Sequence, residues 1–323
     1  MKFQQLDLLN TIRTTLATEA SALQKLSEFS GNDYIKVIQE ILNGRSVVVT
    51  GIGKSGIIAQ KWVATFNSTG QPAQFLHAAE AIHGDLGLVL DDALVFCLSK
   101  SGNSPEIQFL INLLKLRSAF IVGVGTNRSS HLAENAHVFI QTPMEKEACP
   151  NNLAPTVSTT LQLAVGDAFA VALMTARNFK SEDFARHHPG GALGKNLFTR
   201  VGDLMRKNSL AKVELNSNLH EVLIEISGKR VGATLVIENE LTHGIITDGD
   251  VRRFIEKNTS LNLNQVHASD LLNPNPSFVD REALAVEAYQ MMEIKKINQL
   301  VVKEQNKPVG FIHIHDILSA GIK

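Results

Sequence analysis

The stretch Ser46-Val-Val-Val-Thr-Gly-Ile-Gly-Lys-Ser-Gly56 decides the fold. Residues 46–50 form a short, mostly apolar run, which is typical of a strand covered on both faces in a parallel sheet. A glycine-rich turn over residues 51–56 follows, and then a helical stretch through Phe66. The stretch therefore predicts one strand-turn-helix unit of an α/β protein.

Strand and helix alternate in this order through the first 200 residues. Apolar runs predict strands at residues 74–76, 93–98, 120–124 and 138–140, and helical patterns predict helices at 105–117 and 156–177. Because crossovers between parallel strands are right-handed, helices should cover both faces of the sheet. We therefore expect residues 1–200 to form a three-layer α/β/α sandwich with a mostly parallel sheet.

Two helices are expected before the first strand. Gly31 and Asn32 interrupt the pattern, and Asp33 is the expected N-cap of a second helix that ends at Leu42. In the first helix, apolar residues at three- and four-residue steps predict a single apolar face: Leu8, Leu9, Ile12, Leu16, Ala20, Leu23 and Leu26.

The C-terminal part contains an internal repeat. Gly244-Ile-Ile-Thr-Asp-Gly-Asp-Val recurs from Gly310 as Gly-Phe-Ile-His-Ile-His-Asp-Ile, a period of 66 residues. Each copy also has a helical stretch and a β run. Small units of this kind bury their apolar faces by stacking on each other. We expect one α+β unit over residues 201–262 and a second over residues 263–323.

Charge and cysteine content exclude several classes of protein. The 323-residue chain has 31 Lys and Arg against 32 Asp and Glu, so it lacks the basic excess of a nucleic-acid binder. Two cysteines can build neither a disulfide framework nor a Cys-rich zinc site, which favours a reducing compartment. The N-terminus does not resemble a signal peptide, and no stretch approaches the ~20 apolar residues of a membrane span. We expect a soluble, cytoplasmic protein.

Two loops that follow predicted strands could hold a phosphate group. Residues 51–56, which include Gly53 and Ser55, match G-x-G-x-x-G, but no acidic residue follows at the distance that a dinucleotide site needs. A tight turn that binds nothing is the alternative. Residues 99–104 place the hydroxyls of Ser99, Ser101 and Ser104 around a glycine at a helix start, which suits a phosphate monoester.

Ser104 could instead be a purely structural N-cap. Phosphate binding is nevertheless the favoured interpretation, because two such loops at the carboxyl ends of parallel strands should converge on one crevice.

Three further segments carry acid or base side chains. Residues 77–87 contain His83, residues 145–150 contain Glu147 just past a strand, and residues 187–194 contain His188 before a Pro-Gly-Gly turn. A carboxylate or histidine at a crevice could transfer protons. The alternatives are a solvated loop, an exposed loop of mixed charge and a linker turn. The histidine spacing is not a metal signature.

Taken together, these segments resemble a sugar isomerase (SIS) domain followed by a pair of CBS domains, and within that group the arabinose 5-phosphate isomerase family. The resemblance covers essentially the whole chain. It rests on the runs GIGKSG (51–56), HAAEAIHGDLG (77–87), SKSGNSPE (99–106), KEACPNNLAPTVSTT (146–160), GDAFAVAL (166–173), HHPGGALGK (187–195) and GIITDGDVRR (244–253).

The resemblance implies reversible conversion of D-ribulose 5-phosphate to D-arabinose 5-phosphate, which feeds synthesis of Kdo for lipopolysaccharide. It places catalytic residues at Lys54, Glu106, Glu147 and His188, a further histidine at His83, and the phosphate loop at Ser99, Ser101 and Ser104, with Ser55 nearby. Glu147 is the expected base. How roles divide among the acidic residues and His188 stays open, since Glu106 could equally complement a helix dipole. An enediol route requires neither a redox cofactor nor a metal.

This chain departs from the family pattern at several positions. The phosphate loop has Asn103 where Glu is common. Lys100 adds a cation that could tighten phosphate binding or could reach a larger anionic ligand. The first CBS repeat keeps Thr247 and Asp250 at the ribose-contact spacing, whereas the second has His313 in place of the hydroxyl. We expect a nucleotide or nucleotide-sugar effector, with packing alone as the alternative.

The resemblance further implies association of the chains, and we expect a homotetramer without nucleic-acid or membrane partners. Two rival functions remain at this point. One is a non-catalytic phosphosugar-sensing regulator, which the absence of a basic DNA-binding unit disfavours. The other is an isomerase of a different ketose phosphate.

Overall fold

The computed structural model describes residues 5–205, 210–258, 262 and 265–323. Two compact units make up the chain, Met1–His187 and His188–Lys323. Each is described by itself. The expected boundary near residue 200 lies within the second unit, so the exact domain limits stay a prediction.

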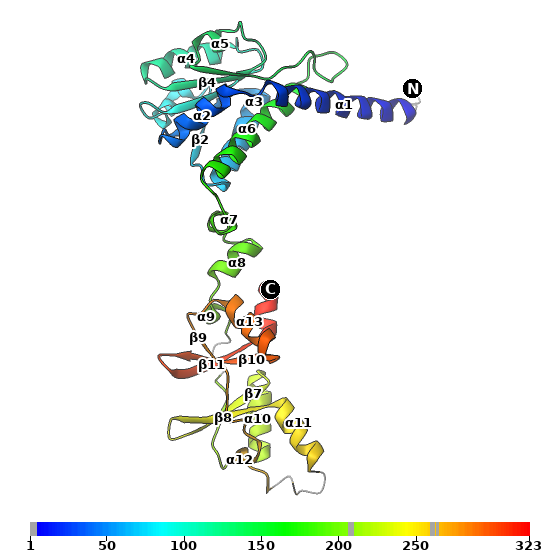
Figure 1. The fold of residues 1–323 in the computed structure, drawn as a ribbon, viewed down its shortest axis with the longest axis vertical. Coiled ribbons are helices and arrows are strands. Elements are labelled where there is room, and N and C mark those ends of the chain that lie inside the picture. The colour runs from blue at the N-terminus through cyan, green and yellow to red at the C-terminus, as the bar shows by residue number, and fades with distance from the viewer. Residues whose placement is uncertain (1–4, 206–209, 259–261, 263–264) are drawn as a thin grey trace. The chain divides into compact units, whose positions relative to one another are not determined.

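A five-stranded sheet forms the centre of the first unit (Figure 1). Its strands run in the order β2-β1-β3-β4-β5, and all four neighbouring pairs are parallel. The parallel sheet expected from the sequence is confirmed. The strands are β1 (Val47–Gly51), β2 (Ala73–His77), β3 (Leu94–Leu98), β4 (Phe120–Gly125) and β5 (Val138–Gln141).

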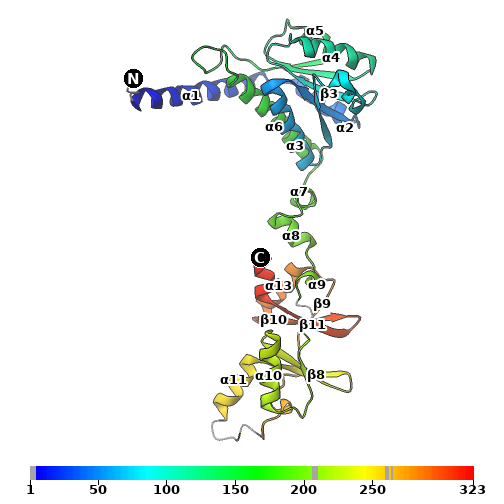
Figure 2. The same cartoon turned by 180° about the vertical axis from the view of Figure 1, so that it is seen from behind.

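Helices cover both faces of this sheet, so the unit has three layers (Figure 2). One face carries α1 (Gln5–Phe29), α2 (Asn32–Leu42), α3 (Gly53–Ser68) and α6 (Val157–Ala176). The other carries α4 (Pro105–Leu116), α5 (His131–Asn135) and the short 3-10 helices η1 (Ala81–His83) and η2 (Asp85–Leu88). The helix α7 (Ser181–His187) ends the unit.

The predicted N-cap of α2 is wrong by two residues. Gly31 adopts the extended backbone of an N-cap, so the helix begins at Asn32 and Asp33 lies in its first turn. At that position the carboxylate still complements the positive end of the helix dipole.

Aromatic side chains fill the core between α3, α6 and the sheet. Trp62 is fully buried, and its ring centroid lies 5.3 Å from that of Phe96. The indole Nε1 donates a hydrogen bond to the carbonyl oxygen of Gln162 at 2.9 Å. A Cβ on Gly166 would lie 2.2 Å from that nitrogen, so only glycine allows α6 to pack this closely on α3.

Contrary to the expectation from sequence, one described helix is long and apolar enough to cross a membrane by length and composition. It is α6, and half of the residues in its most apolar window are buried inside the unit. Leu161, Val165, Phe169 and Leu173 pack in the core. The apolarity of α6 is therefore that of a central core helix.

The amino-terminal half of α1 keeps its apolar face exposed. Leu8, Leu9, Ile12 and Leu16 are each at least 44% exposed, whereas Ala22 and Leu26 farther along are buried. Figures 1 and 2 show this end of α1 extending away from the rest of its unit. The expected apolar face exists, but only its second half reaches the core.

The second unit contains the predicted repeat. Two three-stranded sheets have the same topology, with β7 between β6 and β8 in one and β10 between β9 and β11 in the other. In each, the first pair is parallel and the second antiparallel. Each has a β-bulge, after Val236 and after Val302, which are one period apart. The strands are β6 (Lys212–Val213), β7 (Ala233–Glu238), β8 (Leu241–Thr247), β9 (Phe278–Asp280), β10 (Gln299–Glu304) and β11 (Lys307–His313). The longer helices are α8 (Ala192–Phe198), α10 (Leu219–Lys229), α11 (Asp248–Lys257), α13 (Ala285–Lys295) and α14 (Ile314–Ser319).

The two repeats exchange their first short helices. α9 (Val201–Leu204) packs into the core of the second repeat, where the Val201 N–H donates to the Ala283 carbonyl at 2.9 Å. α12 (Ala268–Leu271) packs into the core of the first, where the Ala268 N–H donates to the Ser217 carbonyl at 2.8 Å. The core of each folded domain therefore contains residues from both copies of the sequence repeat.

Candidate functional site

The side of the sheet on which the following helix packs changes between the strands β1 and β3. These strands are neighbours, and the helices that follow them, α3 and α4, pack on opposite faces. In open α/β sheets this switch point, at the carboxyl ends of the strands, is where ligands bind. Both predicted phosphate loops lie there.

The loop between β3 and α4 is held in a fixed shape. The buried Ser99 hydroxyl accepts a hydrogen bond from the Gly102 N–H at 3.1 Å. Ser101 Oγ accepts from the Asn103 N–H at 3.3 Å, and Asn103 Oδ1 accepts from the His131 N–H at 2.8 Å. Asn103, which departs from the family pattern, therefore ties the loop to the start of α5.

Ser104 presents a buried hydroxyl with no hydrogen-bond partner in the described protein. It occupies the N-cap position of α4, but its side chain does not cap the helix. An unpartnered buried hydroxyl costs free energy, which a phosphate oxygen accepting from it would recover. The Ser104 side chain therefore does not play the capping role, and phosphate binding by Ser104 stays a prediction.

Replacing Ser104 with alanine should weaken substrate binding without weakening the fold. Loss of one hydrogen bond to a charged group should raise KM about tenfold. The free energy of unfolding should stay within about 0.5 kcal/mol, since no protein contact is lost. The control is Ser130→Ala, because the Ser130 hydroxyl donates to the Asn127 carbonyl and accepts from the Ala133 N–H. Urea denaturation should show a loss only for Ser130→Ala. An equal loss for Ser104→Ala would contradict this assignment.

The loop after β1 is a tight turn that opens α3. Gly53, with φ of +57°, begins the helix, and Lys54 and Ser55 occupy its first turn. A Cβ on Gly51 would lie 2.9 Å from the backbone of Ser55, so the turn requires glycine there. Lys54 is exposed, and its amino group is free to reach a ligand at this edge of the sheet.

Glu147 lies in the loop between β5 and α6, with its side chain fully buried. Oε1 accepts hydrogen bonds from Lys100 Nζ at 2.8 Å and Ser158 Oγ at 2.6 Å. Oε2 accepts from the N–H groups of Thr156 at 2.9 Å and Ser158 at 3.2 Å, and from Thr156 Oγ1 at 3.2 Å. The carboxylate therefore caps the start of α6 and pairs with the phosphate loop.

These contacts change the acidity of Glu147. Burial alone would raise its pKa, but the hydrogen bonds from Lys100, Ser158 and the backbone of α6 outweigh burial and lower the pKa to about 2. The carboxylate is thus ionised at neutral pH and weakly basic, which does not favour the expected role as base.

The remaining predicted residues occupy different surroundings. Glu106 lies half-buried in the first turn of α4, next to the phosphate loop, whereas His83 is exposed in η1. His188 belongs to the second unit and is therefore not placed relative to the others. Among the described residues, no group of three or more His, Cys, Asp or Glu side chains is arranged to hold a metal.

Sequence reasoning missed the residues that hold Glu147. Thr156 and Ser158 lie in a run that resembles the family, but the sequence alone assigns them no role. Their hydroxyls stand at a predicted helix start, directly after a loop with a carboxylate. That pattern could have suggested a carboxylate cap.

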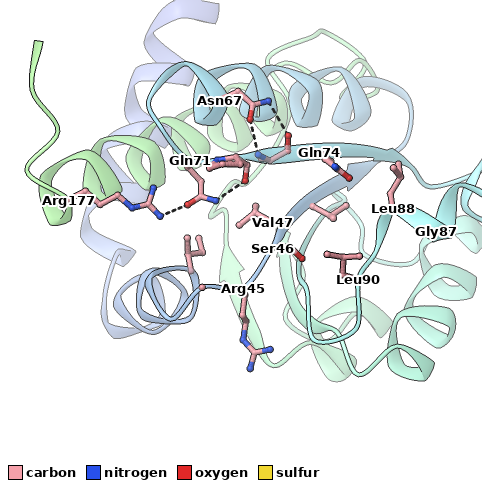
Figure 3. A pocket seen from close by; sticks show the side chains of 15 residues that line it. Arg45, Ser46, Val47, Asn67, Gln71, Gln74, Gly87, Leu88, Leu90 and Arg177 are labelled. Carbon is pink, nitrogen blue, oxygen red and sulfur yellow. Dashed lines mark hydrogen bonds between the residues drawn. The ribbon is translucent and has the colours of Figure 1, made fainter. Parts of the chain in front are cut away.

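The pocket in Figure 3 lies at the opposite edge of the sheet. Ser46 and Ala73, at the amino ends of β1 and β2, line it. Its polar groups bond to one another, as Arg177 donates to Gln71 Oε1 at 2.6 Å and Asn67 bonds the backbone of Ala73. None of the predicted site residues lines this pocket.

The second unit has a polar cleft of its own. Residues from both repeats line it, including Thr247, Asp248, Arg253, Lys296 and His313. Asp250 is not among its lining residues. The Asp250 carboxylate instead accepts from the backbone N–H and the hydroxyl of Thr247, at 2.9 and 2.6 Å, and caps α11.

Comparison with known proteins gives the same two-part organisation. The SIS domain model matches residues 40–172, and the CBS domain model matches residues 201–257 and 268–323. The chain is 41% identical to arabinose 5-phosphate isomerase KdsD of Pseudomonas aeruginosa, over 99% of this chain and 98% of that protein. It is 40% identical to arabinose 5-phosphate isomerase KpsF of Escherichia coli, over 96% and 95%.

A solved structure also matches the first part of the chain. This is an E. coli CFT073 protein in complex with arabinose 5-phosphate, with a TM-score of 0.55 and 36% identity. The match covers 58% of this chain and 100% of that one.

Proposed function

Since this chain belongs to the arabinose 5-phosphate isomerase family, with a SIS domain followed by paired CBS domains, we propose that it interconverts D-ribulose 5-phosphate and D-arabinose 5-phosphate. The product supplies synthesis of Kdo for lipopolysaccharide. The 41% identity over nearly the whole of both chains carries this proposal, and the buried Ser104 hydroxyl at the switch point supports it.

The chemistry needs a proton acceptor and a positive charge. Aldose–ketose isomerisation removes a proton next to a carbonyl and passes through an enediolate. Lys54, exposed at the edge of the sheet, is the proposed cation that stabilises the developing oxyanion. Glu106 and His188 are the proposed groups for proton transfer. Glu106 reaches this edge from the first turn of α4.

The substrate phosphate is proposed to bind the loop between β3 and α4. The hydroxyls of Ser99, Ser101 and Ser104 and the N-terminus of α4 point to an anion of this kind. The first turn of α3, with Gly53 and Ser55, supplies further donors, and His83 is proposed to contact the sugar.

Turnover by the purified full-length protein tests this function. Ribulose 5-phosphate should yield arabinose 5-phosphate, identified by chromatography against both standards. Tight binding of either sugar phosphate without turnover would instead favour the phosphosugar sensor. Turnover of another ketose phosphate in a substrate panel, with ribulose 5-phosphate inert, would favour the third function.

The cleft of the CBS pair is proposed to bind a nucleotide or nucleotide-sugar. Arg253 and Lys296 give it cations suited to phosphate groups, and Thr247 lines it. Such a ligand should change the activity of the full chain, and Arg253→Met should remove the response. Activity that adenine and cytidine nucleotides leave unchanged, together with no binding in calorimetry, would mean that the pair only packs.

Assembly into a homotetramer is proposed from the exposed apolar face of α1. Leu8, Leu9, Ile12 and Leu16 would gain burial against a second copy. Analytical ultracentrifugation should show a tetramer, and Ile12→Asp with Leu16→Asp should lower the association state. A monomeric native protein would contradict this. We also propose a cytoplasmic location, where the sugar phosphates would be available.

A further inference from the structure

Glu147 joins three parts of the first unit through one carboxylate. Its own loop follows β5, two of its oxygen contacts reach the first turn of α6 through Ser158, and one reaches the phosphate loop through Lys100. The side chain is fully buried. A carboxylate in this position shapes the site whether or not it touches the substrate.

The hydrogen-bonding capacity of Glu147 is already used. A carboxylate offers about four lone-pair positions. Five donors occupy its two oxygens, at distances from 2.6 to 3.2 Å. A sugar proton could reach an oxygen only after one of these donors left.

The acidity of Glu147 does not suit a base either. A general base works best with a pKa near the operating pH, and the same donors lower the pKa of Glu147 to about 2. Protonating it would also leave the Lys100 cation and the first N–H groups of α6 without their anionic partner.

Hydrogen bonds hold both the backbone and the side-chain amino group of Lys100. Its carbonyl oxygen accepts from the Thr126 N–H at 3.1 Å and from Thr126 Oγ1 at 2.6 Å. Its Nζ lies 2.8 Å from Glu147, while 39% of the side chain stays exposed. Lys100 is thus held within the loop by its backbone and its ammonium group, while its side chain as a whole stays partly exposed at the site.

We propose that Glu147 is a positioning residue, which fixes Lys100 at the phosphate loop and anchors the start of α6, and that it does not accept the substrate proton. This inference rests on the proposed isomerase function. Proton abstraction then falls to another group, and Glu147 affects catalysis through the binding of the phosphate.

A double-mutant cycle tests the proposal. Glu147→Gln keeps the shape of the side chain and should raise KM about tenfold, with kcat lowered less than about tenfold. In a Lys100→Met background, the same change should add less than about threefold to KM. A fall in kcat of about 100-fold or more in both backgrounds, with KM unchanged, would identify Glu147 as the base and overturn the proposal.

Two further variants serve as controls for this experiment. Lys100→Arg keeps the cation and should restore KM to within about threefold of the wild type, which a purely structural role of the pair does not predict. Lys146→Met removes an exposed charge beside Glu147 in the chain and should leave KM unchanged. If Glu147→Gln fails to fold, Lys100→Met decides alone, since it leaves Glu147 in place. A KM unchanged by Lys100→Met would then refute the proposal.

Failure of the proposed isomerase function can be distinguished from failure of the proposal for Glu147. If the isomerase function is wrong, the wild type shows no turnover of ribulose 5-phosphate. In that event, the same cycle is measured as the dissociation constant of arabinose 5-phosphate by calorimetry. Weakened and non-additive binding would support the positioning role, and unchanged binding in all variants would refute it.

Discussion

Replacing Lys54 with methionine should lower kcat for arabinose 5-phosphate about 100-fold or more, the usual cost of removing a group that stabilises a developing oxyanion. Lys54 stands in the first turn of α3, exposed at the carboxyl edge of the sheet. The enediolate carries a negative charge that neither substrate nor product has on its carbon chain. A cation aimed at that charge therefore acts mainly on kcat.

Lys61 provides the matched control for this prediction. It lies on the same helix, farther from the edge of the sheet, and pairs with Asp167 of α6. Lys61→Met removes the same charge and should change kcat less than about twofold. A Lys54→Met enzyme with normal kcat and a raised KM would show that Lys54 binds the phosphate instead.

Replacing Gly102 with alanine should disrupt the phosphate loop and raise KM at least about 30-fold, because several phosphate donors would move together. Gly102 has a φ of +68°, and an added Cβ would lie 2.3 Å from Ser130 Oγ and 2.6 Å from Ser130 Cβ. Ser130 is buried and bonded to Asn127 and Ala133, so it has little room to move. Steady-state kinetics with ribulose 5-phosphate measure the effect.

The variant Gly44→Ala is the control that tests backbone strain in the absence of a steric clash. It also has a positive φ, of +98°, but a Cβ there would meet nothing within 4 Å. Gly44→Ala should cost about 1 kcal/mol of unfolding free energy and leave KM unchanged. If Gly102→Ala behaved like Gly44→Ala, the contact with Ser130 would not control the shape of the loop.

The sheet could be predicted because its strands are marked locally. The apolar runs at residues 93–98 and 120–124 are bounded by turn residues, and the structure places β3 and β4 within a residue of those limits. The position of the two phosphate loops then follows from parallel pairing, since every such strand ends at the same edge.

The contacts of Glu147 could not be predicted in the same way. Lys100 and Glu147 belong to loops after different strands, and their pairing depends on how β3, β4 and β5 are placed side by side. From sequence alone, a carboxylate in a loop of mixed charge is expected to be exposed to solvent. Its complete burial comes from the start of α6 folding over it, which is a tertiary effect.

The paired CBS repeats show a different limit of prediction from sequence. The period of 66 residues located both copies, and it also recurs in the two β-bulges. However, a repeat in sequence does not state which copy a short terminal helix packs against. Val201 and Ala268 each lie in the core of the other copy, an outcome that depends on the stacking of the two sheets.

Trp62 makes the first unit separately observable in solution. It is the only tryptophan in the chain, and it is fully buried between α3, α6 and the sheet. Its fluorescence therefore reports the melting of the isomerase unit and is silent toward the CBS pair, whereas far-ultraviolet circular dichroism records both. Because each unit has its own core clusters, the difference between the two signals assigns a transition to one unit or the other.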